Sequence, residues 1–122
     1  IGVSEYVEFA DKIPPEQFYK LMSRAKAVIM PSIWPEPFGR IPAEANRLGT
    51  PAVVTNRGGL PETIINGETG FIVEPSSNSL ATGLMRIFEA RWRSTDVASL
   101  SLKHLDPYAI QRKFFEYLNR IV

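Results

Sequence analysis

The stretch AVIMPSIWPEPFGRIPAEA, residues 27–45, decides the fold of this chain. Its first four residues are all apolar, which is typical of a strand that is buried on both faces of a parallel sheet. Pro31-Ser32 ends that run, and a proline-rich loop then leads into a helical pattern over residues 38–49, which Gly49 caps. A buried strand, a loop and a helix in succession predict the repeating unit of an α/β fold.

Strands and helices continue to alternate on both sides of this stretch. The predicted elements are a strand at 6–9, a helix opened by Pro14 and Pro15, strands at 27–30, 52–54 and 71–73, a short helix at 61–65, a helix through Leu80, Leu84, Ile87 and Phe88, and a C-terminal helix through Ile110, Phe114, Tyr117, Leu118 and Ile121. This order predicts an α/β fold with a Rossmann-like parallel sheet flanked by helices. Such sheets bind ligands at the carboxyl ends of their strands, which here are followed by segments 10–13, 31–39 and 55–59.

The composition excludes several classes of protein. The chain has 122 residues, enough for one domain, and its 14 basic and 13 acidic residues give a net charge of +1, so electrostatic binding to nucleic acid is not predicted. No apolar run has the length of a membrane span, so membrane association is not indicated. The lack of cysteine excludes disulfides and thiolate metal sites and fits a cytoplasmic location, and the single histidine, His104, disfavours a histidine-rich metal site.

The chemistry of the chain is concentrated around the start of the helix at residues 38–49. Glu36 lies in the loop before that helix, and Glu44 lies one to two turns inside it. The free N–H groups and the positive dipole end of a helix attract a diphosphate, while carboxylates accept hydrogen bonds from sugar and ribose hydroxyls. Gly39 lets the backbone come close to a ligand, although it also fits a simple helix start. The pattern therefore favours a nucleoside diphosphate sugar as the ligand.

Several ordered blocks of the sequence resemble the retaining glycosyltransferases of family 4, which belong to the glycosyl transferases group 1 and have the GT-B fold. Glu36 to Glu44 resembles the E-x7-E motif of that family, and the resemblance covers roughly residues 6 to 90. The other matching blocks are Val7-Glu8-Phe9, Pro31-Ser32, Gly49 to Val54, Gly58 to Glu62 and Asn66 to Val73. The resemblance implies that residues 1–122 form a single, partial domain, the later part of the C-terminal, nucleotide-sugar-binding domain of a GT-B enzyme.

The resemblance also implies roles for individual residues. Glu36 is the candidate catalytic residue, because the first Glu of the motif contacts the donor sugar. The other implied donor-binding residues are Phe38 and Gly39 at the sugar and phosphates, Glu44 at the ribose and, on weaker grounds, Asp11, Lys12 and Ile13 beside the base. Arg40 is a further candidate for a phosphate contact, with a plain surface arginine as the alternative. Trp34 fits either stacking on a sugar or partial burial, and Gly58-Gly59 fits either a phosphate cradle or a turn.

The chain departs from the family pattern in what it lacks. The diphosphate-binding Arg and Lys of the family, two central strands and the acceptor domain lie upstream of the residues matched here. We therefore expect that this chain alone is inactive, that an N-terminal acceptor domain or partner chain is missing, and that the segment at 6–9 is repositioned, poorly ordered or completed by another chain. The family also usually has a glycine two residues after the Phe of this first strand, where this chain reads Phe9-Ala10-Asp11. No D-x-D motif occurs, which predicts donor binding without a metal ion or other cofactor.

The function that the resemblance implies is transfer of a hexosyl group from a UDP- or GDP-sugar to an acceptor hydroxyl with retention of configuration. A non-catalytic nucleotide-sugar-binding module or subunit is the alternative. A GT-B epimerase is a third interpretation, which the single histidine disfavours.

Overall fold

The computed structural model describes residues 2–121, without the side chains of residues 113, 114, 117 and 121. Its elements are η1 (Ser4–Tyr6), α1 (Pro15–Arg24), β1 (Val28–Met30), α2 (Arg40–Arg47), β2 (Ala52–Thr55), η2 (Leu60–Thr63), β3 (Gly70–Val73), α3 (Ser77–Glu89), α4 (Ser94–His104) and α5 (Pro107–Ile121). The predicted α/β class is confirmed.

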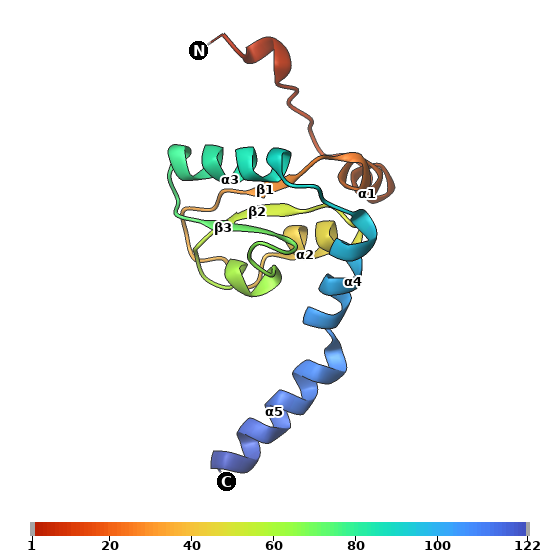
Figure 1. Ribbon diagram of the computed structural model, residues 1–122, viewed down its shortest axis with the longest axis vertical. Coiled ribbons are helices and arrows are strands. Elements are labelled where there is room, and N and C mark those ends of the chain that lie inside the picture. The colour runs from red at the N-terminus through yellow and green to blue at the C-terminus, as the bar shows by residue number, and fades with distance from the viewer. Residues whose placement is uncertain (1, 122) are drawn as a thin grey trace.

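A three-stranded parallel sheet organises the described residues, with β2 between β1 and β3. Helix α3 covers one face and α2 lies on the other (Figure 1). Side chains alternate between the two faces along β2, so this strand contributes residues to the hydrophobic cluster on each face of the sheet. Val53 points toward α3 and packs with Phe71 and Ile87, while Ala52 and Val54 pack with Leu60 and Ile64 on the opposite face. All four residues of β2 are buried, as the sequence predicted for a central parallel strand.

Helix α2 has a glycine at each end, and a buried amide near its C-terminus bonds it to the sheet. Gly39 at its N-cap has φ +84° and Gly49 just beyond its C-terminus has φ +85°, both in the left-handed region. Asn46 is fully buried, and its Nδ2 donates to the carbonyls of Thr50 and Thr69 at 3.0 and 2.9 Å. These two hydrogen bonds connect the C-terminal end of α2 to the residues that precede β2 and β3, and so fix the position of the helix relative to the sheet.

Two predictions about strands are wrong. Residues 6–9 form no strand: the helical turn η1 ends at Tyr6, and the chain then runs unpaired, with Phe9 94% exposed and the segment lying away from the sheet (Figure 1). The run at 27–30 is not buried on both faces, because β1 is an edge strand in which Ile29 is 41% exposed. Both differences concern the free edge of the sheet at β1, and the sequence was expected to lack two central strands of the family pattern.

The helices differ from the prediction in three places. The short helix expected at 61–65 is the 3-10 turn η2, and Phe88, which was expected on the buried face of α3, is 63% exposed. Helix α4 was not predicted, and it packs on α2 with Val97 and Ser101 buried. Of the apolar residues predicted for the last helix, Ile110 is 52% exposed and Leu118 is half-buried, while the side chains of Phe114, Tyr117 and Ile121 lie outside the described residues. None of the helices that the structure describes is long and apolar enough to cross a membrane.

Candidate functional site

Two loops meet at the carboxyl ends of β1 and β2. The loop after β1 carries Glu36, whose carbonyl accepts a hydrogen bond from Gly59 N–H, in the loop after β2, at 2.7 Å. The two backbones lie so close that a Cβ on Gly58 would meet the carbonyl oxygen and nitrogen of Glu36, and a Cβ on Gly59 would meet the carbonyl of Pro37. The pair Gly58-Gly59 therefore serves close packing of one loop on another, and Gly58 also has φ +55°.

A buried hydroxyl fixes the first half of the β1 loop to the sheet. Thr55, the last residue of β2, is fully buried, and its Oγ1 donates to the carbonyl of Ser32 at 2.6 Å. Ser32 is itself buried, with 5% exposure. Thr55 bonds to Ser32 and Gly59 bonds to Glu36, so the loop is fixed on both sides of residues 33–35. The position of Glu36 is therefore set by β2 and the loop that follows it.

The carboxylate of Glu36 is held from its own loop. Trp34 Nε1 donates to Oε1 of Glu36 at 2.9 Å, and Ser32 Oγ lies 3.5 Å from the same oxygen. Glu36 is half-buried, whereas the Trp34 side chain is 59% exposed, so neither stacking nor core packing fixes the indole within this chain. Both hydrogen bonds are accepted by Oε1, which leaves Oε2 as the oxygen for another donor.

The amino end of α2 has the geometry of an anion-binding helix start, with one modification. Gly39 is buried, and a Cβ there would collide with the side chain of Leu60, so packing inside the chain and a positive φ explain this glycine. Pro42 has no N–H, which leaves Arg40 and Ile41 as the first-turn residues that can offer one. Ligand contact by Gly39 remains a prediction.

Glu44 forms an ion pair one turn inside α2. Arg40 Nη2 donates to Glu44 Oε1 at 2.9 Å, and the side chains are 79% and 26% exposed, respectively. This hydrogen bond, together with the charge of the carboxylate, raises the pKa of Arg40. Arg40 thus extends along its own helix toward Glu44.

A hollow of about 410 Å³ opens beside this ion pair, between α1 and α2. Its lining residues are Ile13, Pro15, Phe18, Tyr19, Arg40, Ile41 and Glu44. The structure thus brings Ile13 and Glu44 to one hollow, and their roles at the base and the ribose stay predictions. Asp11 and Lys12 are exposed and do not line it. Phe38 lies on the other side of the ion pair, in a hollow of about 270 Å³ that reaches Leu105 and Pro107.

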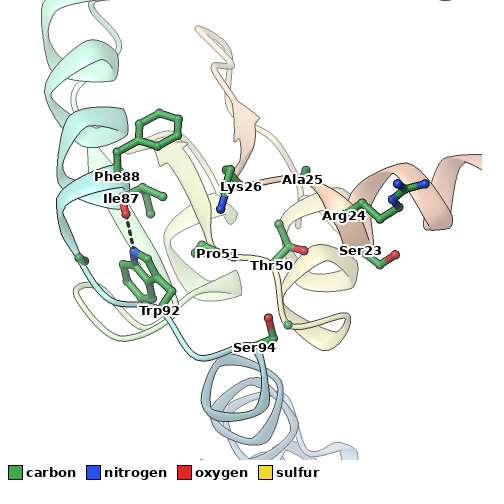
Figure 2. A pocket seen from close by; sticks show the side chains of 12 residues that line it. Ser23, Arg24, Ala25, Lys26, Thr50, Pro51, Ile87, Phe88, Trp92 and Ser94 are labelled. Carbon is green, nitrogen blue, oxygen red and sulfur yellow. Dashed lines mark hydrogen bonds between the residues drawn. The ribbon is translucent and has the colours of Figure 1, made fainter.

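A third hollow, of about 350 Å³, lies at the opposite end of the sheet (Figure 2). It is lined by the segments that precede β1 and β2, residues 23–26 and 49–51, and by Trp92, whose Nε1 donates to the carbonyl of Ile87 at 2.9 Å. These are the amino ends of the strands, whereas ligands of parallel sheets bind at the carboxyl ends. We therefore place the candidate site at Glu36 and Glu44.

Some structural partners of the site were missed by sequence reasoning. The Trp34–Glu36 bond had a visible signal, because a single proline separates the two residues, but the role of Thr55 depends on the pairing of β1 with β2. His104 is exposed at the end of α4, where its Nε2 lies 2.8 Å from the carbonyl of Glu62. Among the described residues, no cluster of three or more His, Cys, Asp or Glu side chains is arranged to hold a metal ion.

The fold and the paired acidic residues at a helix start define a class of protein, and comparison with known families identifies it. The sequence model of the family "Glycosyl transferases group 1" matches residues 1–101, so the chain belongs to that family. It is 39% identical over 74 residues to the D-inositol 3-phosphate glycosyltransferase of Corynebacterium diphtheriae, covering 61% of this chain and 17% of that protein.

Two solved structures resemble the chain. Sucrose-phosphate synthase from Thermosynechococcus elongatus superposes with a TM-score of 0.77 and 29% identity over 98% of this chain and 31% of its own. Anabaena HepE, solved in complex with UDP and with UDP-glucose, superposes with a TM-score of 0.59 and 26% identity over 83% of this chain and 29% of its own. The chain thus has the fold of the later C-terminal part of a GT-B glycosyltransferase, and spans less than a third of each of these relatives.

Proposed function

We propose that residues 1–122 are a single, partial domain that binds the donor in a retaining, family-4 hexosyltransferase using a nucleoside diphosphate sugar. The observation that carries the proposal is that Glu36 is held at the carboxyl end of β1, directly before α2, with Glu44 one turn inside that helix. The first turn of α2 therefore lies between the two carboxylates in the chain, where the diphosphate that joins the sugar to the ribose is expected.

Each residue then has a distinct task. Glu36 Oε2 accepts a hydroxyl of the donor sugar, Glu44 accepts the ribose diol, and Ile13 supplies an apolar wall for the base. The first N–H groups of α2 and its dipole stabilise the charge that develops on the leaving diphosphate, so that a metal ion is not required for that role. Arg40 reaches the phosphates when it leaves Glu44.

An acceptor domain outside these residues completes the enzyme in this proposal. The support is that the matched relatives are at least three times longer than the part that aligns, and that two hollows beside α2 are open to solvent. Binding clefts lie preferentially between domains. The chain alone is therefore expected to bind the donor weakly and to transfer nothing.

A matched set of variants tests the two acidic residues in the full-length protein. Calorimetry with UDP and with UDP-glucose, repeated with GDP and GDP-mannose, identifies the nucleotide. Glu44→Gln should then lower the affinity for the free nucleotide and for the nucleotide sugar alike, by about tenfold. Glu36→Gln should lower the affinity for the nucleotide sugar alone, by a similar factor. Glu68→Gln, an exposed turn carboxylate, is the control.

Several outcomes would contradict the proposal. Failure of both nucleotides to bind the full-length protein would remove the donor site, and binding without turnover would favour the non-catalytic module. Loss of activity on addition of EDTA would contradict metal independence. An α-configured product from an α-configured donor is expected, and inversion of configuration would exclude the retaining reaction.

A further inference from the structure

We propose that Trp34 is a positioning residue: its indole N–H holds one oxygen of the Glu36 carboxylate so that the other oxygen faces the donor sugar. The inference rests on the proposed role of Glu36 and adds a residue that acts through it. The observation behind it is the 2.9 Å bond from Trp34 Nε1 to Glu36 Oε1.

The loop is built to keep this bond. Trp34 and Glu36 each precede a proline, Pro35 and Pro37, and a residue before proline is confined to extended backbone. Proline also fixes its own φ near −65°, so that the segment from Trp34 to Pro37 has few alternative conformations. Only Pro35 lies between the two residues, and the indole N–H reaches the carboxylate at 2.9 Å.

The exposure of the indole argues that the N–H is its useful part. Trp34 is 59% exposed, and its indole N–H is hydrogen-bonded to Glu36. A tryptophan that served packing within these residues would bury more of its ring. Ser32 Oγ, at 3.5 Å from the same oxygen, is a longer and weaker second donor.

The arrangement divides the two oxygens of Glu36 between two tasks. Oε1 faces Trp34 and Ser32, while the carbonyl of Glu36 is fixed by Gly59, so the side chain and the backbone of this residue are both restrained. A carboxylate restrained at one oxygen presents the other in a defined direction before the donor arrives. Such preorganisation lowers the cost of ordering the site on binding.

Variants that separate the ring from the N–H test the inference in the full-length protein. Trp34→Phe keeps an aromatic ring without a donor, and Trp34→Gln supplies an N–H without a ring. Replacement of Trp34 by benzothienylalanine, in which sulfur replaces the indole N–H, changes the donor and preserves the shape. Ile33→Ala, at a neighbouring side chain that is 72% exposed, is the control for disturbance of the loop.

The readout is the ratio of UDP affinity to UDP-glucose affinity, or of the GDP pair if that nucleotide binds. We expect Trp34→Phe and the benzothienylalanine replacement to lower the affinity for UDP-glucose by about tenfold and to leave the affinity for UDP unchanged. Trp34→Gln should lose less affinity for UDP-glucose than Trp34→Phe does. Equal weakening of both ligands would show a merely structural role and overturn the inference. If Trp34 instead stacked on the sugar, Trp34→Phe would keep the affinity for UDP-glucose and Trp34→Gln would lower it. That result would also overturn the inference.

A double-mutant cycle separates failure of this inference from failure of the proposed function. In a Glu36→Ala background, Trp34→Phe should have no further effect, because the carboxylate on which it acts is gone. If Glu36→Ala itself leaves UDP-glucose affinity unchanged, the proposed role of Glu36 fails. If Glu36→Ala weakens binding while Trp34→Phe does not, the role of Trp34 alone fails.

The bond itself is visible by NMR. The indole N–H signal of Trp34, assigned through its loss in Trp34→Phe, should shift when Glu36 is replaced by Ala. The indole signal of Trp92, which is bonded to the carbonyl of Ile87, should stay in place. An unmoved Trp34 signal would show that the bond is absent in solution and would overturn the inference.

Discussion

Gly58 is required for two separate physical reasons. Its φ of +55° lies in the left-handed region, and its missing Cβ leaves room for the backbone of Glu36. Gly67 shares the first reason alone, since its φ is +85° and a Cβ there would meet nothing within 4 Å. The two glycines therefore allow backbone strain to be separated from close approach.

Gly58→Ala should cost more stability than Gly67→Ala and should displace the loop that carries Glu36. The left-handed conformation costs an alanine about 1–2 kcal/mol at either site, and the collision with the Glu36 backbone adds to this at residue 58 alone. Urea unfolding of both variants measures the difference. Equal losses would show that the loops do not press together in solution, and unchanged UDP-glucose affinity in Gly58→Ala would separate the loop packing from the site.

The sequence predicted the acidic residues and the glycines of the site but not the reasons for all of them. Gly39 was expected either to admit a ligand or simply to begin the helix, and the left-handed backbone and the side chain of Leu60 are enough to require a glycine there. The sequence pattern shows which residues need no Cβ. It does not show whether the space is filled by a ligand or by the chain, because that depends on contacts between residues far apart in sequence.

At the level of elements, β2 connects the sheet to the site. Its last residue, Thr55, is buried and donates to the carbonyl of Ser32 in the loop after β1. The apolar pattern of residues 52–54 predicted a central strand, and Thr55 ends it with a hydroxyl that a fully apolar strand would lack. At the end of β2, the side chain of Thr55 thus bonds to the loop after β1.

Thr55→Val keeps the shape of the side chain and removes that donor. We expect a loss of about 1–3 kcal/mol in the free energy of unfolding, since the carbonyl of Ser32 loses its buried partner. Thr82→Val is the matched control, because Thr82 Oγ1 donates to the carbonyl of Asn78 on the exposed face of α3 and should lose less than about 0.5 kcal/mol. Equal losses in the two variants, measured by chemical denaturation, would contradict the role of Thr55.

Asn46 presents a second test at this scale. Asn46→Leu fills a similar volume and removes both donors, so the carbonyls of Thr50 and Thr69 each lose a buried bond. The expected cost is about 2–5 kcal/mol. Asn56→Leu, at an exposed residue whose amide lies 3.5 Å from Glu74, should stay within about 0.5 kcal/mol of wild type, and thermal melting compares the two. A loss of less than about 1 kcal/mol in Asn46→Leu would show that solvent replaces the two bonds.

The whole molecule is a layered body with two ends that leave it (Figure 1). Residues 2–12 run away from the sheet at one end, and α5 projects beyond α4 at the other. Local periodicity predicted the sheet and its covering helices well, because each of these elements buries one face within the chain. The strand expected at 6–9 and the buried face expected for β1 failed, since both depend on neighbours that these residues do not supply.

Removal of α5 should leave the layered body intact. Tyr108 and Ile110, near its start, are 72% and 52% exposed, so deletion of residues 107–122 withdraws little apolar surface from the core. We expect the free energy of unfolding to change by less than about 0.5 kcal/mol. Deletion of residues 94–122 also removes Val97, which is buried against α2, and should cost at least about 1.5–3 kcal/mol. A large loss from the shorter deletion would show that α5 packs on the body in solution.

The hydrogen bond from the Gly59 amide to the carbonyl of Glu36 has a consequence for how the site can be observed. An amide exchanges its proton with deuterated solvent when its bond opens, so the rate at Gly59 measures how often the two loops part. A single peak then records the opening of the acidic loop without any sugar or nucleotide present. Slower exchange after a ligand is added would give the free energy by which that ligand closes the loops.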